Sequence, residues 1–154
     1  MLQSPGAAAR LLAALLLLAA CGDDPVDPDP ACGDAPPLPF GRTVAESLLP
    51  ASDALLDGSL IDYYSLYPEG PGTVTIEMGA ERSGDHTVDP FLYLWSQDLG
   101  DPLAQAYDPT GVGPLRVARL TLGVSSGCYR VGASTWRPSE AGEYTIRAEF
   151  IPAP

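Results

Sequence analysis

Lysine is absent from this 154-residue chain, and histidine occurs once, as His86. The eight basic residues are therefore all arginines, and they face 20 acidic residues, which gives a formal net charge of −12. Such an excess of carboxylates repels nucleic-acid phosphates and anionic lipid head groups. The composition thus argues against a nucleic-acid partner.

The familiar catalytic motifs are also missing. The chain contains no Gly-rich phosphate loop, no CxxC pair and no HExxH string. His86 lies in a hydrophilic segment between Asp85 and Asp89, where the two carboxylates could ligate a cation or one could assist His86 as the general base of a small hydrolase. A lone histidine supplies only one member of a zinc set or a catalytic triad, so a solvated loop residue is the simpler interpretation. We predict that the chain is not an enzyme.

No hydrophobic run is long enough to span a bilayer. The run Leu11 to Ala20 has ten residues, too few for a hydrocarbon core of about 30 Å, and it follows Arg10 as in a secretory signal. Its end, Leu18-Ala19-Ala20-Cys21, resembles the bacterial lipobox. That resemblance implies cleavage before Cys21, which would then carry a diacylglycerol thioether and an acylated amine, with fatty chains such as palmitate forming a stable anchor. The alternative is an ordinary secretory signal with a chance cysteine.

The residues after the lipobox predict a location in the cell envelope and a spacer. Gly22 follows the cysteine, and in the enterobacterial sorting rule that this lipobox resembles, Asp at that position retains a lipoprotein at the inner membrane. We therefore expect a lipid-anchored cell-envelope protein, in the outer rather than the inner membrane. Residues 21–39 are rich in proline and aspartate, which predicts a semi-rigid, disordered, solvated tether rather than a metal site.

From residue 40 onward, short alternating segments predict β-strands separated by Pro- and Gly-containing turns. We expect an entering edge strand within 40–58, and the hairpin-like stretch Ser125 to Phe150 is the clearest of all. Val74, Ile76 and Met78 should point inward, and the uniformly apolar Phe91–Trp95 should be covered on both faces, with Trp95 in the core. The fold class is all-β: an antiparallel, jelly-roll-like β-sandwich of about seven to eight strands at 40–154, after signal peptide 1–20 and tether 21–39. The other expected strands lie at 60–66, 73–78, 91–95, 103–107 and 115–122.

Five motifs in this order resemble the bacterial pre-peptidase C-terminal domain. They are Asp62–Leu66 (DYYSL), Gly72–Ile76 (GTVTI), Asp89–Leu94 (DPFLYL), Ser126–Val131 (SGCYRV) and Gly142–Ile146 (GEYTI). The resemblance implies a small, non-catalytic jelly-roll β-sandwich of exported proteins. Some members bind calcium, and some bind a polymer such as collagen or polysaccharide.

Three aspartates at predicted strand edges are candidate calcium ligands: Asp62, Asp89 and Asp108. Calcium needs six or more oxygen ligands, whereas an aspartate at such a position more often bonds its own backbone in a turn. Where many members of the family carry paired aspartates, this chain has Tyr107-Asp108-Pro109 with one carboxylate, which counts against family-type calcium binding.

Cys32 and Cys128 are the cysteines left once Cys21 is lipidated. Export places them in an oxidising compartment, so a disulfide between them is predicted, with two free thiols as the alternative.

The expected function is that of a non-catalytic binding or structural module of the cell envelope. Its partner would be an envelope protein or a polysaccharide. Trp136 and the adjacent Arg137, in the loop of the last hairpin, are the predicted binding residues, because an exposed indole can stack on a sugar. The alternatives are a small envelope hydrolase and a calcium-dependent module that binds collagen or polysaccharide.

Overall fold

A computed structural model describes residues 33–81, 88–96, 100–108 and 115–154. The signal peptide, Cys21, Cys32 and His86 lie outside these residues. Within the described parts of the chain, no helix is long and apolar enough to cross a membrane.

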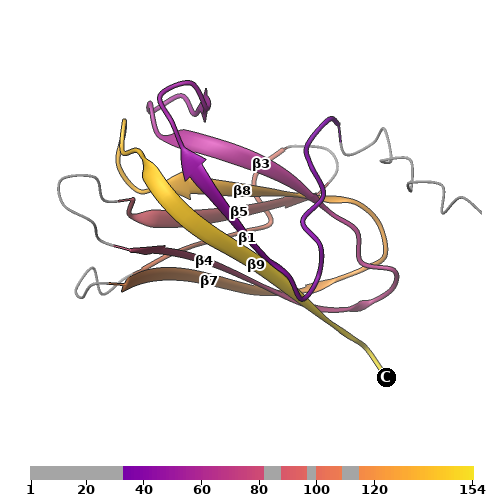
Figure 1. Ribbon diagram of the computed structural model, residues 1–154. Coiled ribbons are helices and arrows are strands. Elements are labelled where there is room, and N and C mark those ends of the chain that lie inside the picture. Colours follow the sequence, from indigo (N-terminus) through magenta and orange to yellow (C-terminus); the bar gives the residue numbers. More distant parts are fainter. Residues whose placement is uncertain (1–32, 82–87, 97–99, 109–114) are drawn as a thin grey trace, which may run out of the picture.

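Two antiparallel sheets face each other across the core (Figure 1). The four-stranded sheet has the order β1 (Thr43–Leu48), β9 (Gly142–Pro152), β4 (Gly72–Glu81) and β7 (Leu115–Val124). The five-stranded sheet has the order β2 (Asp53–Ala54), β3 (Leu60–Leu66), β8 (Tyr129–Thr135), β5 (Pro90–Ser96) and β6 (Ala104–Tyr107). The predicted all-β, antiparallel sandwich is confirmed, and the short β2 adds a strand that a two-residue segment cannot signal in sequence.

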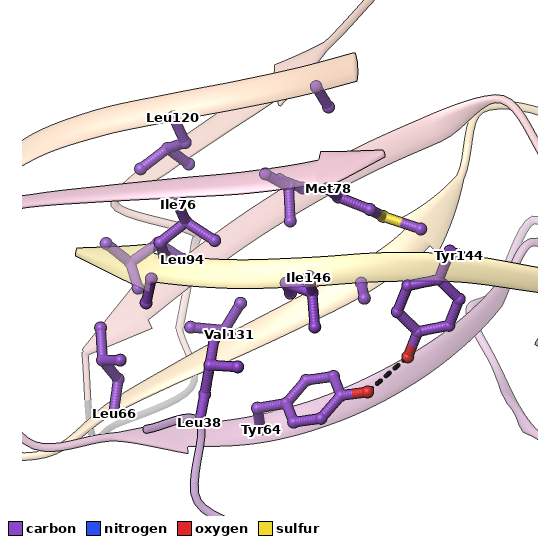
Figure 2. Close-up of a cluster of buried hydrophobic side chains, with 14 of the residues drawn as sticks. Leu38, Tyr64, Leu66, Ile76, Met78, Leu94, Leu120, Val131, Tyr144 and Ile146 are labelled. Carbon is purple, nitrogen blue, oxygen red and sulfur yellow. Dashed lines mark hydrogen bonds between the residues drawn. The ribbon is translucent and has the colours of Figure 1, made fainter. Parts of the chain in front are cut away.

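The core forms where the alternating residues of both sheets meet (Figure 2). Val74, Ile76 and Met78 of β4 are fully buried, as their spacing predicts, because side chains of a strand alternate between its two faces. Ile146 of β9 is fully buried as well, and Val131 of β8, from the other sheet, belongs to the same buried cluster. Burial of one such side chain contributes roughly 1.5–3 kcal/mol. The buried side chains between the two sheets therefore make the main contribution to the stability of the fold.

A chain of hydroxyl groups crosses the sandwich at one end of this core. The hydroxyls of Tyr64 on β3 and Tyr144 on β9 are 2.5 Å apart (Figure 2), and Tyr144 donates to Oδ2 of Asp62 at 2.8 Å. Since the single hydrogen of Tyr144 goes to the carboxylate, Tyr64 must donate to Tyr144. Burial raises the pKa of both tyrosines, so both remain protonated at neutral pH.

The segment before β1 belongs to the sandwich, which corrects the predicted tether boundary at residue 39. The N–H of Ser65 donates to the carbonyl of Pro36 at 2.9 Å, and the N–H of Leu38 donates to the carbonyl of Ser65 at 2.8 Å. Leu38 is only 3% exposed and joins the core. Proline-rich composition predicted a spacer here, but the segment pairs with the open edge of β3 and contributes one apolar side chain.

Candidate functional site

The three predicted calcium ligands do not come together. Asp62 accepts a hydrogen bond from Tyr144, whereas Asp89 forms an ion pair of 2.5 Å with Arg116, and Asp108 acts on the same guanidinium. The hydrogen bond that Arg116 donates to Asp89 is the main reason why the pKa of Arg116 is raised.

An arginine therefore supplies the positive charge that calcium would have supplied beside Asp89. Among the described residues, no group of three or more His, Cys, Asp or Glu side chains is placed to hold a metal ion. The candidate calcium site is therefore not formed by these three aspartates, because Asp89 and Asp108 act on Arg116 whereas Asp62 lies at the tyrosine network.

The outer face of the five-stranded sheet carries a continuous set of aromatic rings. We call these six residues the aromatic row: Tyr63, Phe91, Tyr93, Trp95, Tyr107 and Trp136. Alternation explains their common side, because Phe91, Tyr93 and Trp95 occupy every second position of β5 while Leu92 and Leu94 point into the core. The register then brings Tyr107 of β6 directly opposite Phe91.

The rings contact one another from one end of the row to the other. The ring centroids of Tyr107 and Trp136 are 4.7 Å apart, and that of Phe91 lies 5.4 Å from Trp136. The row continues from Phe91 to Tyr93 at 4.6 Å, and from Tyr93 to Trp95 at 5.0 Å. Tyr63 completes it at 6.0 Å from Trp95. These separations are typical of paired aromatic side chains, which fix each other's orientation.

Trp95 lies on this outer face and not in the core, which corrects the sequence prediction. The uniformly apolar segment Phe91–Trp95 suggested cover on both faces, but its outer side carries Phe91, Tyr93 and Trp95, which contact other rings of the aromatic row. Gly132 of β8 makes the arrangement possible. A Cβ built there would stand 2.8 Å from Cζ3 of Trp95 and 2.7 Å from Cδ1 of Ile61, so the indole lies over a position that admits no side chain.

Trp136 is 50% exposed, as predicted for a surface residue, and its loop is held in place. Its backbone N–H donates to the carbonyl of Asp89 at 2.8 Å, and the hydroxyl of Thr135 donates to the carbonyl of Arg137 at 2.8 Å. Tyr107, which stacks on Trp136, is 49% exposed. Trp136 therefore presents its ring on a fixed backbone at one end of the aromatic row, while the exposed Arg137 follows it in the loop.

Carboxylates and one guanidinium border the row. Asp53 acts electrostatically on Tyr63, and Asp57 acts on Tyr93. Burial is the main cause that raises the pKa of both tyrosines, and these carboxylates add to it. The guanidinium carbon of Arg130 lies 5.4 Å from the ring centroid of Tyr63, within the range of a cation–π contact. The row thus combines apolar rings with hydrogen-bonding groups at its border.

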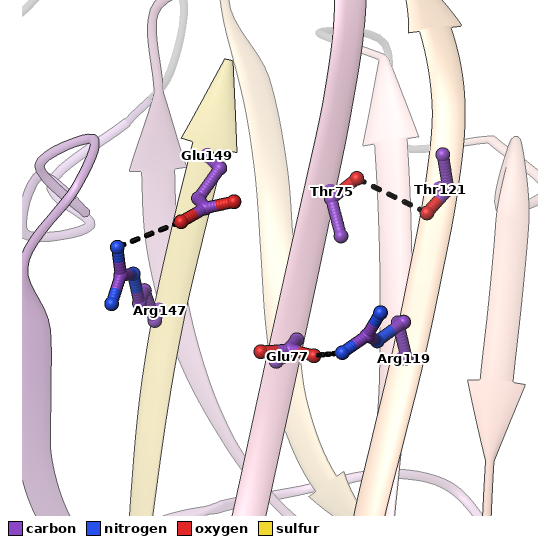
Figure 3. A network of polar contacts seen from close by, with 6 residues as sticks. All are labelled: Thr75, Glu77, Arg119, Thr121, Arg147 and Glu149. Carbon is purple, nitrogen blue, oxygen red and sulfur yellow. Dashed lines mark hydrogen bonds and ion pairs between the residues drawn. The ribbon is translucent and has the colours of Figure 1, made fainter. Parts of the chain in front are cut away.

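The outer face of the other sheet is different in kind (Figure 3). It carries cross-strand polar pairs, namely Thr75 with Thr121 at 3.1 Å and Glu77 with Arg119, and on β9 Arg147 pairs with Glu149 at 2.7 Å. Exposed pairs of this type contribute little to stability and keep a sheet face soluble. The outer face with polar pairs is typical of a solvated sheet surface, so the aromatic face is the candidate binding surface.

The protein is an all-β, antiparallel sandwich, and comparison with solved structures defines its fold more closely. No family model and no curated protein matches the chain. The pre-peptidase C-terminal domain of a collagenase from Bacillus anthracis is similar in structure, with a TM-score of 0.53 at 14% identity over 75% of this chain and 95% of that chain. The predicted pre-peptidase-C-like fold is confirmed.

A second solved structure, CBM35 of Abf62 from Cellvibrio japonicus, aligns over 69% of this chain and 98% of that chain at 14% identity, with a TM-score of 0.38. The assignment of the fold rests on the first structure.

Proposed function

We propose that the chain is a lipid-anchored, non-catalytic binding module of the bacterial cell envelope, and that the aromatic row is its binding surface. The observation that carries this proposal is the exposure of Trp136 and Tyr107 at the end of a ring set that the described residues leave open. Large apolar rings on one face of a soluble sandwich mark a contact surface, because leaving them in water costs free energy that a partner recovers.

The absence of an enzyme activity is part of the same proposal. The sequence has no catalytic motif, and its only histidine, His86, lies outside the described residues. A rigid platform of rings suits binding by shape and dispersion, which needs no nucleophile or general base.

The lipid anchor supplies the first test. Replacing Cys21 by Ala removes the thiol to which the diacylglycerol would be attached, so we expect the protein to leave the membrane fraction and appear in soluble form. Fractionation of cells that express the full chain, followed by mass spectrometry of the Cys21 peptide, measures this. A wild-type peptide without the mass of attached acyl chains would refute the lipoprotein part of the proposal.

The binding surface supplies the second test. A photo-crosslinking amino acid placed at Tyr107 in the full chain, in its own cells, is expected to form covalent adducts with an envelope macromolecule. The same amino acid at Ile151, which is 68% exposed on β9 of the polar sheet, is the matched control and should form few adducts. Equal yields at both positions, or none at Tyr107, would show that the aromatic row is not a binding surface.

A further inference from the structure

The aromatic row offers an extended surface and not a pocket for one small molecule. It crosses the sheet from Tyr107 on β6 through β5 and over β8 to Tyr63 on β3. Three inter-strand spacings give it a width of about 14 Å. A ligand that uses the whole row must therefore be a chain of several linked units.

Resting on the binding role proposed above, we infer that this row binds a chain of neutral pyranose sugars. The C–H groups on the flat side of a pyranose carry a partial positive charge, and the face of an aromatic ring carries a partial negative one. Tyr93 stacks on Trp95 at 5.0 Å, and Tyr107 stacks on Trp136 at 4.7 Å. Trp136 and Tyr107 remain half exposed in their stack, so they keep open ring surface on which such a sugar face can lie.

The charges around the row select a neutral chain. At Tyr63 the effect of Asp53 exceeds that of Arg130, and Asp57 acts on Tyr93, so a phosphate- or uronate-containing polymer meets net like charge there. The same carboxylates accept hydrogen bonds from hydroxyl groups, and the exposed amide of Gln105, directly opposite Tyr93 in the register, can donate as well as accept. Sugar hydroxyls satisfy both kinds of partner at the border of the rings.

The test is retention of the purified, detergent-extracted full chain on insoluble cellulose and on chitin. We expect both neutral polymers, or one of them, to retain it, and the variant Trp136→Ala with Tyr107→Ala to bind at least about tenfold more weakly, since a tenfold loss equals about 1.4 kcal/mol and two rings are lost. Trp136→Phe keeps a ring and should keep most of the binding. Leu115→Ala with Ile151→Ala removes exposed apolar side chains from the other sheet and should change nothing. Circular dichroism verifies that each variant is folded.

The outcomes distinguish the sugar assignment from the proposed binding role of the aromatic row. Failure of the wild-type chain to bind either neutral polymer, or equal binding to the polyanion alginate or to gelatin, would overturn the sugar assignment. If crosslinks from Tyr107 still formed in cells, the binding role would stand with another ligand. Loss of both results would overturn both.

Discussion

Replacing Cys128 by Ala is expected to lower the free energy of unfolding by about 4 kcal/mol, through loss of the predicted disulfide to Cys32. In the chain-entropy model, a cross-link that closes a loop of about 100 residues restricts the unfolded chain strongly and leaves the folded chain almost unaffected. This is the largest single stability effect that we predict, and it comes from a residue that directly precedes β8 and is only 6% exposed.

The described residues next to Cys32 support this pairing. Gly33 packs so closely against Arg130 that a Cβ at Gly33 would stand 2.5 Å from Nη2 of the arginine. Arg130 is two positions from Cys128, and the segment that follows Gly33 is hydrogen-bonded along β3 through Ser65. The described segment that begins at Gly33 thus lies beside β8, the strand that directly follows Cys128.

Chemical denaturation with and without reductant measures the effect. Cys32→Ala should cost about as much as Cys128→Ala, and the double variant should cost no more than either single one, because the two residues act through one bond. Reductant should destabilise the wild-type chain and leave the variants unchanged. Two separately alkylated cysteines in the non-reduced, digested protein would contradict the bridge.

Replacing Tyr144 by Phe is expected to lower the free energy of unfolding by about 2 kcal/mol. The loss of this hydroxyl leaves the half-buried carboxylate of Asp62 without its donor and the buried hydroxyl of Tyr64 without its acceptor. Buried polar groups that lose a partner carry their full desolvation cost, so the effect exceeds that of one average hydrogen bond.

Tyr67→Phe is the matched control. The hydroxyl of Tyr67 is buried and has no hydrogen-bond partner among the described residues, so its removal should cost almost nothing. Equilibrium denaturation in urea compares the two variants, and equal losses for Tyr67→Phe and Tyr144→Phe would contradict the importance of the network.

The network also predicts a response to alkaline pH. Burial raises the pKa of Tyr64 and Tyr144 above the ordinary value of 10.0, so above that pH the unfolded chain releases protons that the folded chain retains. Stability is therefore fully present below pH 10 and falls as the pH rises further. Tyr144→Phe should make this decline less steep, and urea denaturation at a series of alkaline pH values measures it.

The strands were predictable because their information is local. Val74, Ile76 and Met78 alternate with polar residues, and this period-two pattern alone assigns one side to the core. The motifs from Asp62 to Ile146 also sufficed to indicate the pre-peptidase-C-like sandwich, and Trp136 was predicted to be exposed. Two errors, Trp95 in the core and residues 33–39 in the tether, arose where composition was uniform and offered no pattern.

The candidate site was only partly predictable, since it joins residues from four separate segments. Tyr63, Tyr93 and Tyr107 are unremarkable in sequence, and only the pairing of β3, β8, β5 and β6 places them on one face. Gly132 gave no signal either, although its missing side chain is what allows Trp95 to lie across β8.

Side-chain alternation along the strands was enough to predict the sandwich and the inward face of β4, and the order of residues near the N-terminus predicts an anchor. The common row of aromatic rings and the different partners of Asp62 and Asp89 follow only from the three-dimensional structure. Both depend on strand order and register, which are set by packing between residues far apart in the chain.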